Sequence, residues 1–333
     1  PFCQDLDTLA FPNWDYWDLD YYIHKLDERL GFISSRGCPY GCSFCSNPAL
    51  RKVIPGDFLR QRIARQVITE IEFSIAKYSR FGFEYIRFDD EVFGLDQAFL
   101  EDYCRLYIQK GLHRRLPWFC QTRVDLLTEK YVDLIAAAGC AVVGLGVETG
   151  DDGVRNRIYK KCFSNQALAK AVDLLKKKNI ACLFYLMYNA PGTDAQERKK
   201  TRQLVARLKP LRATFSPFMF LPKTELAMAY SPPLAHKRSR LSQPPAGIVC
   251  NTNKFLSVVY LWVRIRNSFD SGLRLKGVGF IADLFRFIYL KVFCLKVKFF
   301  SLSGLERGLF QLEYFTIFKY AIDRAKKNFK PTA

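Results

Sequence analysis

From Leu30 to Leu221 the chain alternates short β-rich runs with helical patterns, and this alternation constrains the fold more than any other feature. The runs typical of strands cover residues 30–35, 83–90, 117–124, 140–149, 180–188 and 213–221. The helical patterns between them cover residues 57–79, 96–111, 128–139, 164–179 and 193–209, the last opening with the capping-box pair Thr193 and Gln196. Such alternation predicts a parallel sheet with helical crossovers. The continuous apolar run "CAVVGLGV" indicates a sheet that is buried on both faces.

Polar residues follow the predicted strands at the points where parallel sheets bind ligands. In α/β folds of this kind, ligands lie beyond the carboxyl ends of the strands. In chain order, the strands are followed by three cysteines, by Asp89 and Asp90, by Arg123, by Glu148, and by the segment "NAPG". We therefore expect these residues, far apart in the sequence, to converge on one end of the sheet.

The segment "GCPYGCSFCS" holds three cysteines within eight positions, Cys38, Cys42 and Cys45, and no fourth follows. The chain has 11 cysteines, no N-terminal basic-then-apolar run and no regular pairing pattern, which favours a reducing cytoplasm over a secreted disulfide framework. In that compartment clustered cysteines more often bind metal than each other. The remaining eight are predicted to be small buried core residues: Cys3, Cys104, Cys120, Cys140, Cys162, Cys182, Cys250 and Cys294.

Two kinds of metal site use clustered thiolates. A closed zinc site needs four Cys or His ligands, and the histidines His24, His113 and His236 are each isolated, which disfavours structural zinc. Three thiolates on a four-iron cluster leave one iron open for a substrate or cofactor. Gly37 and Gly41 would let the loop fold closely around such a bulky group. Chance clustering in a loop is the remaining alternative.

The "CPYGCSFC" segment, with the aromatic Phe44 just before its last cysteine, resembles the signature of the radical S-adenosylmethionine (radical SAM) enzymes. The resemblance covers roughly residues 1–225 and includes, in order, "FDDEVF", "QTRVDLLTEKYVDLIAAAGC", "GVETG" and "APGT". It implies an α/β fold, a partial (β/α)6 TIM-like barrel. It also implies that Cys38, Cys42 and Cys45 ligate three irons of a [4Fe–4S] cluster while S-adenosylmethionine (SAM) chelates the fourth.

The same resemblance implies roles for five further residues around SAM. Phe44 would sit near the adenine, and Asp89 and Asp90 near the SAM amine, where a carboxylate suits an ammonium-like group. Glu148 matches the family's position for polar SAM contacts, and Arg123 would offset the SAM carboxylate or brace Glu148. Without the resemblance, the two aspartates also fit ordinary loop caps, and Arg123 an ordinary ion-pair partner.

The implied activity is reductive cleavage of SAM to a 5′-deoxyadenosyl radical, supplied with electrons by a reductant such as flavodoxin or ferredoxin. Methyl transfer or rearrangement at an unactivated carbon of a lipid-like or secondary-metabolite substrate is the expected outcome. The alternative is an iron–sulfur electron-transfer protein on the same fold that does not turn SAM over. The resemblance is strongest to enzymes with an N-terminal cobalamin-binding domain, yet the chain has no D-x-H-x-x-G cobalamin pattern. Either that domain precedes Pro1 in a longer protein, or the protein works without cobalamin.

The C-terminal part of the chain differs in charge from the rest. Residues 235–333 hold 18 Lys and Arg against 5 Asp and Glu, whereas residues 1–234 hold 33 against 27. We expect four parts: an N-terminal extension (1–29), the barrel (30–225), a connector (226–250) and a basic, aromatic-rich, mostly helical region (251–333). No run in that last region is long and uncharged enough to span a bilayer. Its charge suits peripheral contact with an anionic membrane or a plain helical cap on the barrel, and nucleic acid is disfavoured because no binding module is recognisable.

Overall fold

The computed structural model describes residues 2–23 and 29–230 of the 333-residue chain. The barrel predicted for residues 30–225 falls wholly within this part. The predictions for the region 251–333 and for most of the connector, including membrane contact, lie outside the described residues. Among the described helices, none is long and apolar enough to cross a membrane.

The core of the fold is a six-stranded sheet whose strands lie in the order β1-β4-β5-β6-β7-β8, each parallel to its neighbour. These strands are β1 (Arg29–Phe32), β4 (Tyr85–Phe88), β5 (Trp118–Thr122), β6 (Cys140–Glu148), β7 (Ala181–Tyr188) and β8 (Arg212–Pro217). Strand β6 is buried along almost its whole length, as its unbroken apolar run predicts. The parallel α/β sheet expected from the sequence is therefore confirmed.

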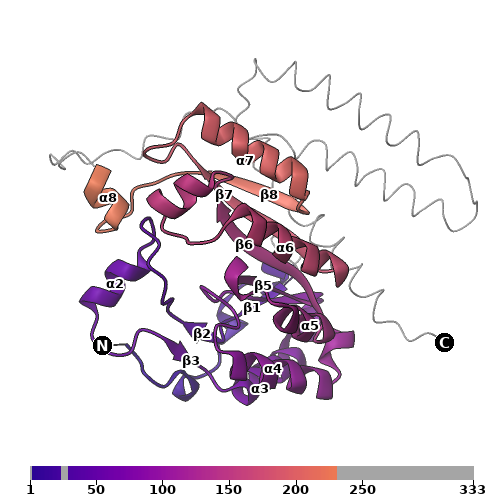
Figure 1. Ribbon diagram of the computed structural model, residues 1–333. Helices are drawn as coiled ribbons and strands as arrows, with labels where there is room; N and C mark the ends of the chain where they lie inside the picture. The colour runs from indigo at the N-terminus through magenta and orange to yellow at the C-terminus, as the bar shows by residue number, and fades with distance from the viewer. Residues whose placement is uncertain (1, 24–28, 231–333) are drawn as a thin grey trace, which may run out of the picture. The chain divides into compact units, whose positions relative to one another are not determined.

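The longer helices connect the strands and lie alongside the sheet (Figure 1). The helices are α1 (Leu19–Tyr21), α2 (Asn47–Val53), α3 (Ala64–Tyr78), α4 (Gln97–Gln109), α5 (Glu129–Ala137), α6 (Asn165–Lys177), α7 (Ala195–Leu208) and α8 (Glu225–Tyr230). Short 3-10 turns cover Leu6–Thr8, Trp14–Tyr16, Ser79–Phe81, Leu112–Arg114 and Val124–Leu126, and a π-helical turn covers Val154–Ile158. One large hydrophobic cluster joins the sheet to α3, α4, α5, α6 and α7.

Side-chain alternation separates the helix-covered face of the sheet from the opposite face. Phe88 and Trp118 both pack edge-on against Tyr103 of α4. Their strand neighbours point the other way because successive side chains alternate, and the Arg87 guanidinium lies 5.2 Å from the ring centre of Phe119. The face away from the helices therefore carries the charged Arg87 beside the aromatic Phe119, and Asp89, which pairs with Arg87, lies just beyond the end of β4.

Two local predictions were wrong, and one helix was missed. The helix expected from residue 57 begins at Ala64, because residues 60–61 form strand β3 (Arg60–Gln61), which pairs antiparallel with β2 (Ser35–Arg36). The N-cap of α7 is Asp194, whose carboxylate accepts the Glu197 N–H at 2.8 Å, and not Thr193. Helix α2 was not predicted.

The expectation that all scattered cysteines are buried holds only in part. Cys104, Cys120, Cys140 and Cys182 are buried, but Cys3 and Cys162 are exposed. Cys250 and Cys294 lie outside the described residues. The exposed pair occurs in irregular segments, where apolar neighbours in the sequence do not ensure a place in the core.

Candidate active site

The three-cysteine segment forms a loop at the carboxyl end of β1, anchored by main-chain contacts. The Ser43 N–H donates to the Tyr159 carbonyl at 3.1 Å, and the Leu226 N–H donates to the Ser43 carbonyl at 2.9 Å. Gly37 has φ +90°, and a Cβ there would lie 2.1 Å from the Phe58 carbonyl oxygen, so only glycine fits. The loop is thus fixed between the β1 end, the segment after β6 and the start of α8.

The thiols of Cys38, Cys42 and Cys45 are free and partly buried. Burial raises the pKa of the Cys38 thiol, and the neighbouring thiols of Cys42 and Cys45 raise it further. Burial also raises the pKa of the Cys42 thiol, but the positive charges of Lys161 and Arg123 oppose that rise. The three thiols therefore lie close enough to influence one another, with two cations nearby. Among the described residues, no group of His, Cys, Asp and Glu is arranged to hold a single metal ion. Three neighbouring thiols in a glycine-containing loop suit a bulkier iron–sulfur cluster.

Arg123, at the end of β5, contacts the cysteine loop, Asp125 and the segment after β6. Its Nη1 lies 3.9 Å from Cys42 Sγ, its Nε donates to Asp125 at 2.9 Å, and its Nη2 donates to the Lys161 carbonyl at 3.1 Å. The guanidinium also lies 3.5 Å from the ring centre of Tyr40, within the loop. Arg123 thus braces the loop against the segment after β6, and its link to Glu148 runs through Lys161.

Glu148 ends β6 as predicted, and its carboxylate pairs with Lys161, a residue that no pattern in the sequence marks. Glu148 Oε1 lies 2.6 Å from Lys161 Nζ, and both side chains are about nine-tenths buried. The Lys161 ammonium also lies 6.0 Å from the ring centre of Phe44. Lys161 precedes the next helix without a periodic pattern to mark it, but a buried glutamate at a strand end is itself a signal that a cation should be sought nearby.

The two predicted aspartates differ in environment. Asp90 is 2% exposed, and its carboxylate accepts the Ser34 hydroxyl and the Ser35 hydroxyl, each at 2.6 Å. Burial raises the pKa of Asp90, and these hydrogen bonds oppose the rise. Asp89 is exposed and pairs with Arg87, with Oδ1 and Nε 2.5 Å apart. Asp90 therefore braces the start of the cysteine loop, whereas Asp89 keeps a solvent-accessible carboxylate.

Phe44 lies next to the cysteines and packs edge-on against Tyr159, with ring centres 5.6 Å apart. Tyr159 is fully buried, and its hydroxyl has no hydrogen-bond partner in the part of the chain that the structure describes. Burial raises the pKa of that hydroxyl, and the nearby carboxylates Glu197 and Glu148 raise it further. The loop aromatic is therefore held against the segment that carries Lys161.

Comparison with known proteins finds one matching family and several relatives of low sequence identity. The model of the radical SAM superfamily matches residues 32–205, which is more than half of the chain. An uncharacterized methyltransferase of Pyrococcus horikoshii is 28% identical over 228 residues, covering 68% of this chain and 47% of the relative. The anaerobic magnesium-protoporphyrin IX monomethyl ester cyclase of Rubrivivax gelatinosus is 27% identical over 230 residues, covering 68% of this chain and 39% of the relative.

Among solved structures, the radical S-adenosylmethionine methyltransferase TsrM of Kitasatospora setae, with tryptophan and a SAM analogue bound, has a TM-score of 0.55 and 20% identity. The match covers 64% of this chain and 40% of that structure. The chain therefore shares the fold and spans less than half the length of each of these three proteins. With the family model matched across most of the sheet and the cysteine loop, the chain belongs to the radical SAM superfamily.

Proposed function

We propose that Cys38, Cys42 and Cys45 hold a [4Fe–4S] cluster, that SAM binds at its open iron, and that the protein cleaves SAM reductively. The observation that carries the proposal is the grouping of three thiols on one loop beside the largely buried cations Arg123 and Lys161. When bound, the cluster supplies the electron that breaks a carbon–sulfur bond of SAM and yields a 5′-deoxyadenosyl radical. The protein's part is binding, orientation and exclusion of water.

The surrounding side chains would divide the contacts to SAM. Phe44 offers an apolar edge for the adenine, and Asp89 offers an accessible carboxylate for the amine. Glu148 and Lys161 offer one acceptor and one donor at the β6 end. Arg123 is the less suitable partner for the SAM carboxylate, because its three nitrogens already contact Asp125, Cys42 and Lys161. We propose Asp90 as a support for the loop and not as a SAM contact.

The outcome that we propose after SAM cleavage is methyl transfer or rearrangement at an unactivated carbon. It is supported by the names of the relatives, a methyltransferase in one case and a cyclase in the other. Lipid-like molecules and secondary metabolites are the proposed substrate classes. The charged pair Arg87 and Asp89 on this face of the sheet favours a substrate that carries charged or hydrogen-bonding groups over a bare hydrocarbon chain.

Cobalamin is a further proposed cofactor, on the condition that a cobalamin-binding domain belongs to the whole protein. A reductant such as flavodoxin or ferredoxin is the proposed electron donor. The division into an N-terminal extension (1–29), a barrel (30–225), a connector (226–250) and a basic region (251–333) stays a proposal. It agrees with the placement of the described strands, which run from Arg29 to Pro217.

Low-temperature electron paramagnetic resonance on the anaerobically reconstituted, reduced protein tests the proposal. A reduced four-iron signal that shifts when SAM is added is the expected result. A signal that does not change when SAM is added would contradict the proposal and favour the electron-transfer alternative. Detection of 5′-deoxyadenosine after reduction with SAM separates the two functions, since an electron carrier would form none. A Cys42→Ala variant serves as the control that should lack the cluster.

A further inference from the structure

Glu148 has an unusual main-chain conformation. Its φ is +64°, in the left-handed region that residues other than glycine seldom adopt. The Thr149 N–H donates to the Val147 carbonyl at 2.8 Å, which closes a three-residue γ-turn centred on Glu148. The register between β6 and β7 also shifts at this point, between Gly146 and Glu148. A strained turn of this kind persists only where the surrounding structure imposes it.

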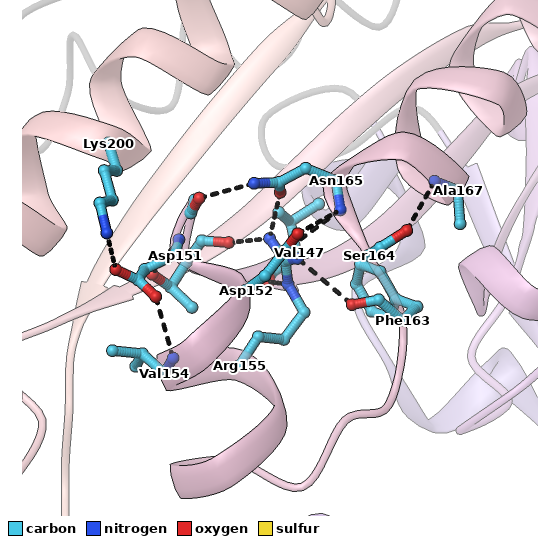
Figure 2. A network of polar contacts seen from close by, with 12 residues as sticks. Val147, Asp151, Asp152, Val154, Arg155, Phe163, Ser164, Asn165, Ala167 and Lys200 are labelled. Carbon is cyan, nitrogen blue, oxygen red and sulfur yellow. Dashed lines mark hydrogen bonds and ion pairs between the residues drawn. The ribbon is translucent and has the colours of Figure 1, made fainter.

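The side chain that holds both ends of this turn is Arg155, from the π-helical turn that follows β6 (Figure 2). Arg155 Nε donates to the Val147 carbonyl at 3.1 Å, and Nη2 donates to the Thr149 carbonyl, so the guanidinium bonds the carbonyls on both sides of Glu148. An arginine has five N–H donors. The other three bonds go to the Asp152 carboxylate, the Phe163 carbonyl and the Asn165 side chain.

Arg155 is fully buried, and its charge is balanced by Asp152. The Asp152 carboxylate in turn accepts the Asn165 N–H at 2.9 Å, so the network also ties the turn to the start of α6 (Figure 2). Every donor of the guanidinium is thus used within the protein. Arg155 has no group left for a ligand, and any functional effect must act through the residues that it holds.

The main chain of Arg155 reaches the second member of the ion pair. The Lys161 N–H donates to the Arg155 carbonyl at 3.1 Å, while Lys161 Nζ contacts Glu148 Oε1 at 2.6 Å. We propose that Arg155 is a positioning residue: its side chain fixes the backbone of Glu148 and its carbonyl fixes Lys161, so that the pair is set for SAM. The inference rests on the proposed function only for the identity of the ligand.

A double-mutant cycle on SAM binding tests the positioning role. The full chain with its cluster reconstituted anaerobically is dialysed against SAM, for wild type, Arg155→Met, Glu148→Gln and the double variant. We expect Arg155→Met to weaken SAM binding at least tenfold in the wild-type background and less than twofold in the Glu148→Gln background. Equal losses in both backgrounds would mean that Arg155 acts by general stabilisation and would overturn the proposal. Arg155→Lys, which keeps the charge beside Asp152 but has fewer donors, should show an intermediate loss.

Hydrogen exchange measured without SAM separates failure of the inference from failure of the proposed function. In Arg155→Met, peptides within residues 145–163 should exchange faster than in wild type, because the turn at Glu148 loses both of its anchors. The matched control is Arg157→Met, on the same helical turn but exposed, which should leave exchange unchanged. Unchanged exchange in Arg155→Met would overturn the inference. Absence of SAM binding by wild type would overturn the proposed function. The hydrogen-exchange comparison would then decide alone whether Arg155 holds the turn at Glu148. If Arg155→Met does not fold, Arg155→Lys carries both measurements.

Discussion

Replacement of Gly146 by alanine tests how closely the Glu148–Lys161 pair is packed against β6. A Cβ at position 146 would lie 2.3 Å from Lys161 Nζ and 2.6 Å from Glu148 Oε1, whereas ordinary contacts begin at 3.4 Å. Each group must therefore retreat by about 1 Å. Because both are the ends of flexible side chains and neither is main chain, the sheet can stay intact while the pair is displaced.

The energetic consequence follows from the geometry. At an effective dielectric constant of about 20, lengthening the 2.6 Å contact by about 1 Å weakens the attraction by about 2 kcal/mol. Removing a glycine from a strand interior returns about 0.5–1 kcal/mol. We expect Gly146→Ala to lower the free energy of unfolding by about 1 kcal/mol, measured by urea denaturation, and to weaken SAM binding at least fivefold, measured by equilibrium dialysis. The double variant Gly146→Ala/Lys161→Met should bind SAM no more weakly than Lys161→Met alone. Wild-type SAM affinity in Gly146→Ala would refute the placement of the pair at the SAM site.

Three further predictions concern neighbouring groups. Arg123→Gln should lower the midpoint potential of the cluster in a redox titration followed by electron paramagnetic resonance, because a positive charge 3.9 Å from Cys42 Sγ is lost; Arg123→Lys should shift it less. Tyr159→Phe should change the free energy of unfolding by less than about 1 kcal/mol, because its hydroxyl has no partner among the described residues, whereas Tyr107→Phe should cost about 1–2 kcal/mol, because its hydroxyl donates to a carbonyl at 2.5 Å. Burial raises the pKa of Asp90 in the folded state, so the folded protein binds this proton more tightly than the unfolded chain does. The free energy of unfolding should therefore fall as pH rises from the unfolded pKa of about 3.9 through the raised folded pKa. Asp90→Asn should remove this fall, measured as urea midpoints against pH.

The sheet could be predicted because its signals are local. The apolar run of β6 needs no information beyond its own residues to indicate a buried strand. The start of α3 could not be predicted from its own residues. The Asp7 carboxylate accepts the Ile63 N–H at 2.7 Å, and Asp7 lies 56 residues earlier in the chain, so a distant segment sets where the helix begins. Helix α2 did carry a local signal, with Pro48 in its first turn, but its few residues gave no clear period.

The candidate site divides in the same way. The cysteines and Glu148 stand out because their residue types conflict with their surroundings, a cluster of thiols in a loop and a carboxylate at the end of an apolar strand. Lys161 and Arg155 do not stand out, since lysine and arginine in an irregular segment are ordinary surface residues. Only the fold shows that Lys161 is buried against Glu148, and that Arg155 is fully buried with its guanidinium bonded to main-chain carbonyls, Asp152 and Asn165.

The contacts of the cysteine loop, Arg123, Lys161, Glu148 and Arg155 form one connected chain. Cys42 contacts Arg123, Arg123 bonds the carbonyl of Lys161, and Lys161 pairs with Glu148 and donates its N–H to Arg155. The cysteine loop and the end of β6 are therefore coupled through Arg123, from the loop after β5, and Lys161, from the segment after β6. Residues that share partners in this way do not contribute additively. A loss of SAM binding in any single variant thus reports on the whole chain of contacts, and only paired substitutions assign the loss to the cluster end or to the Glu148 end.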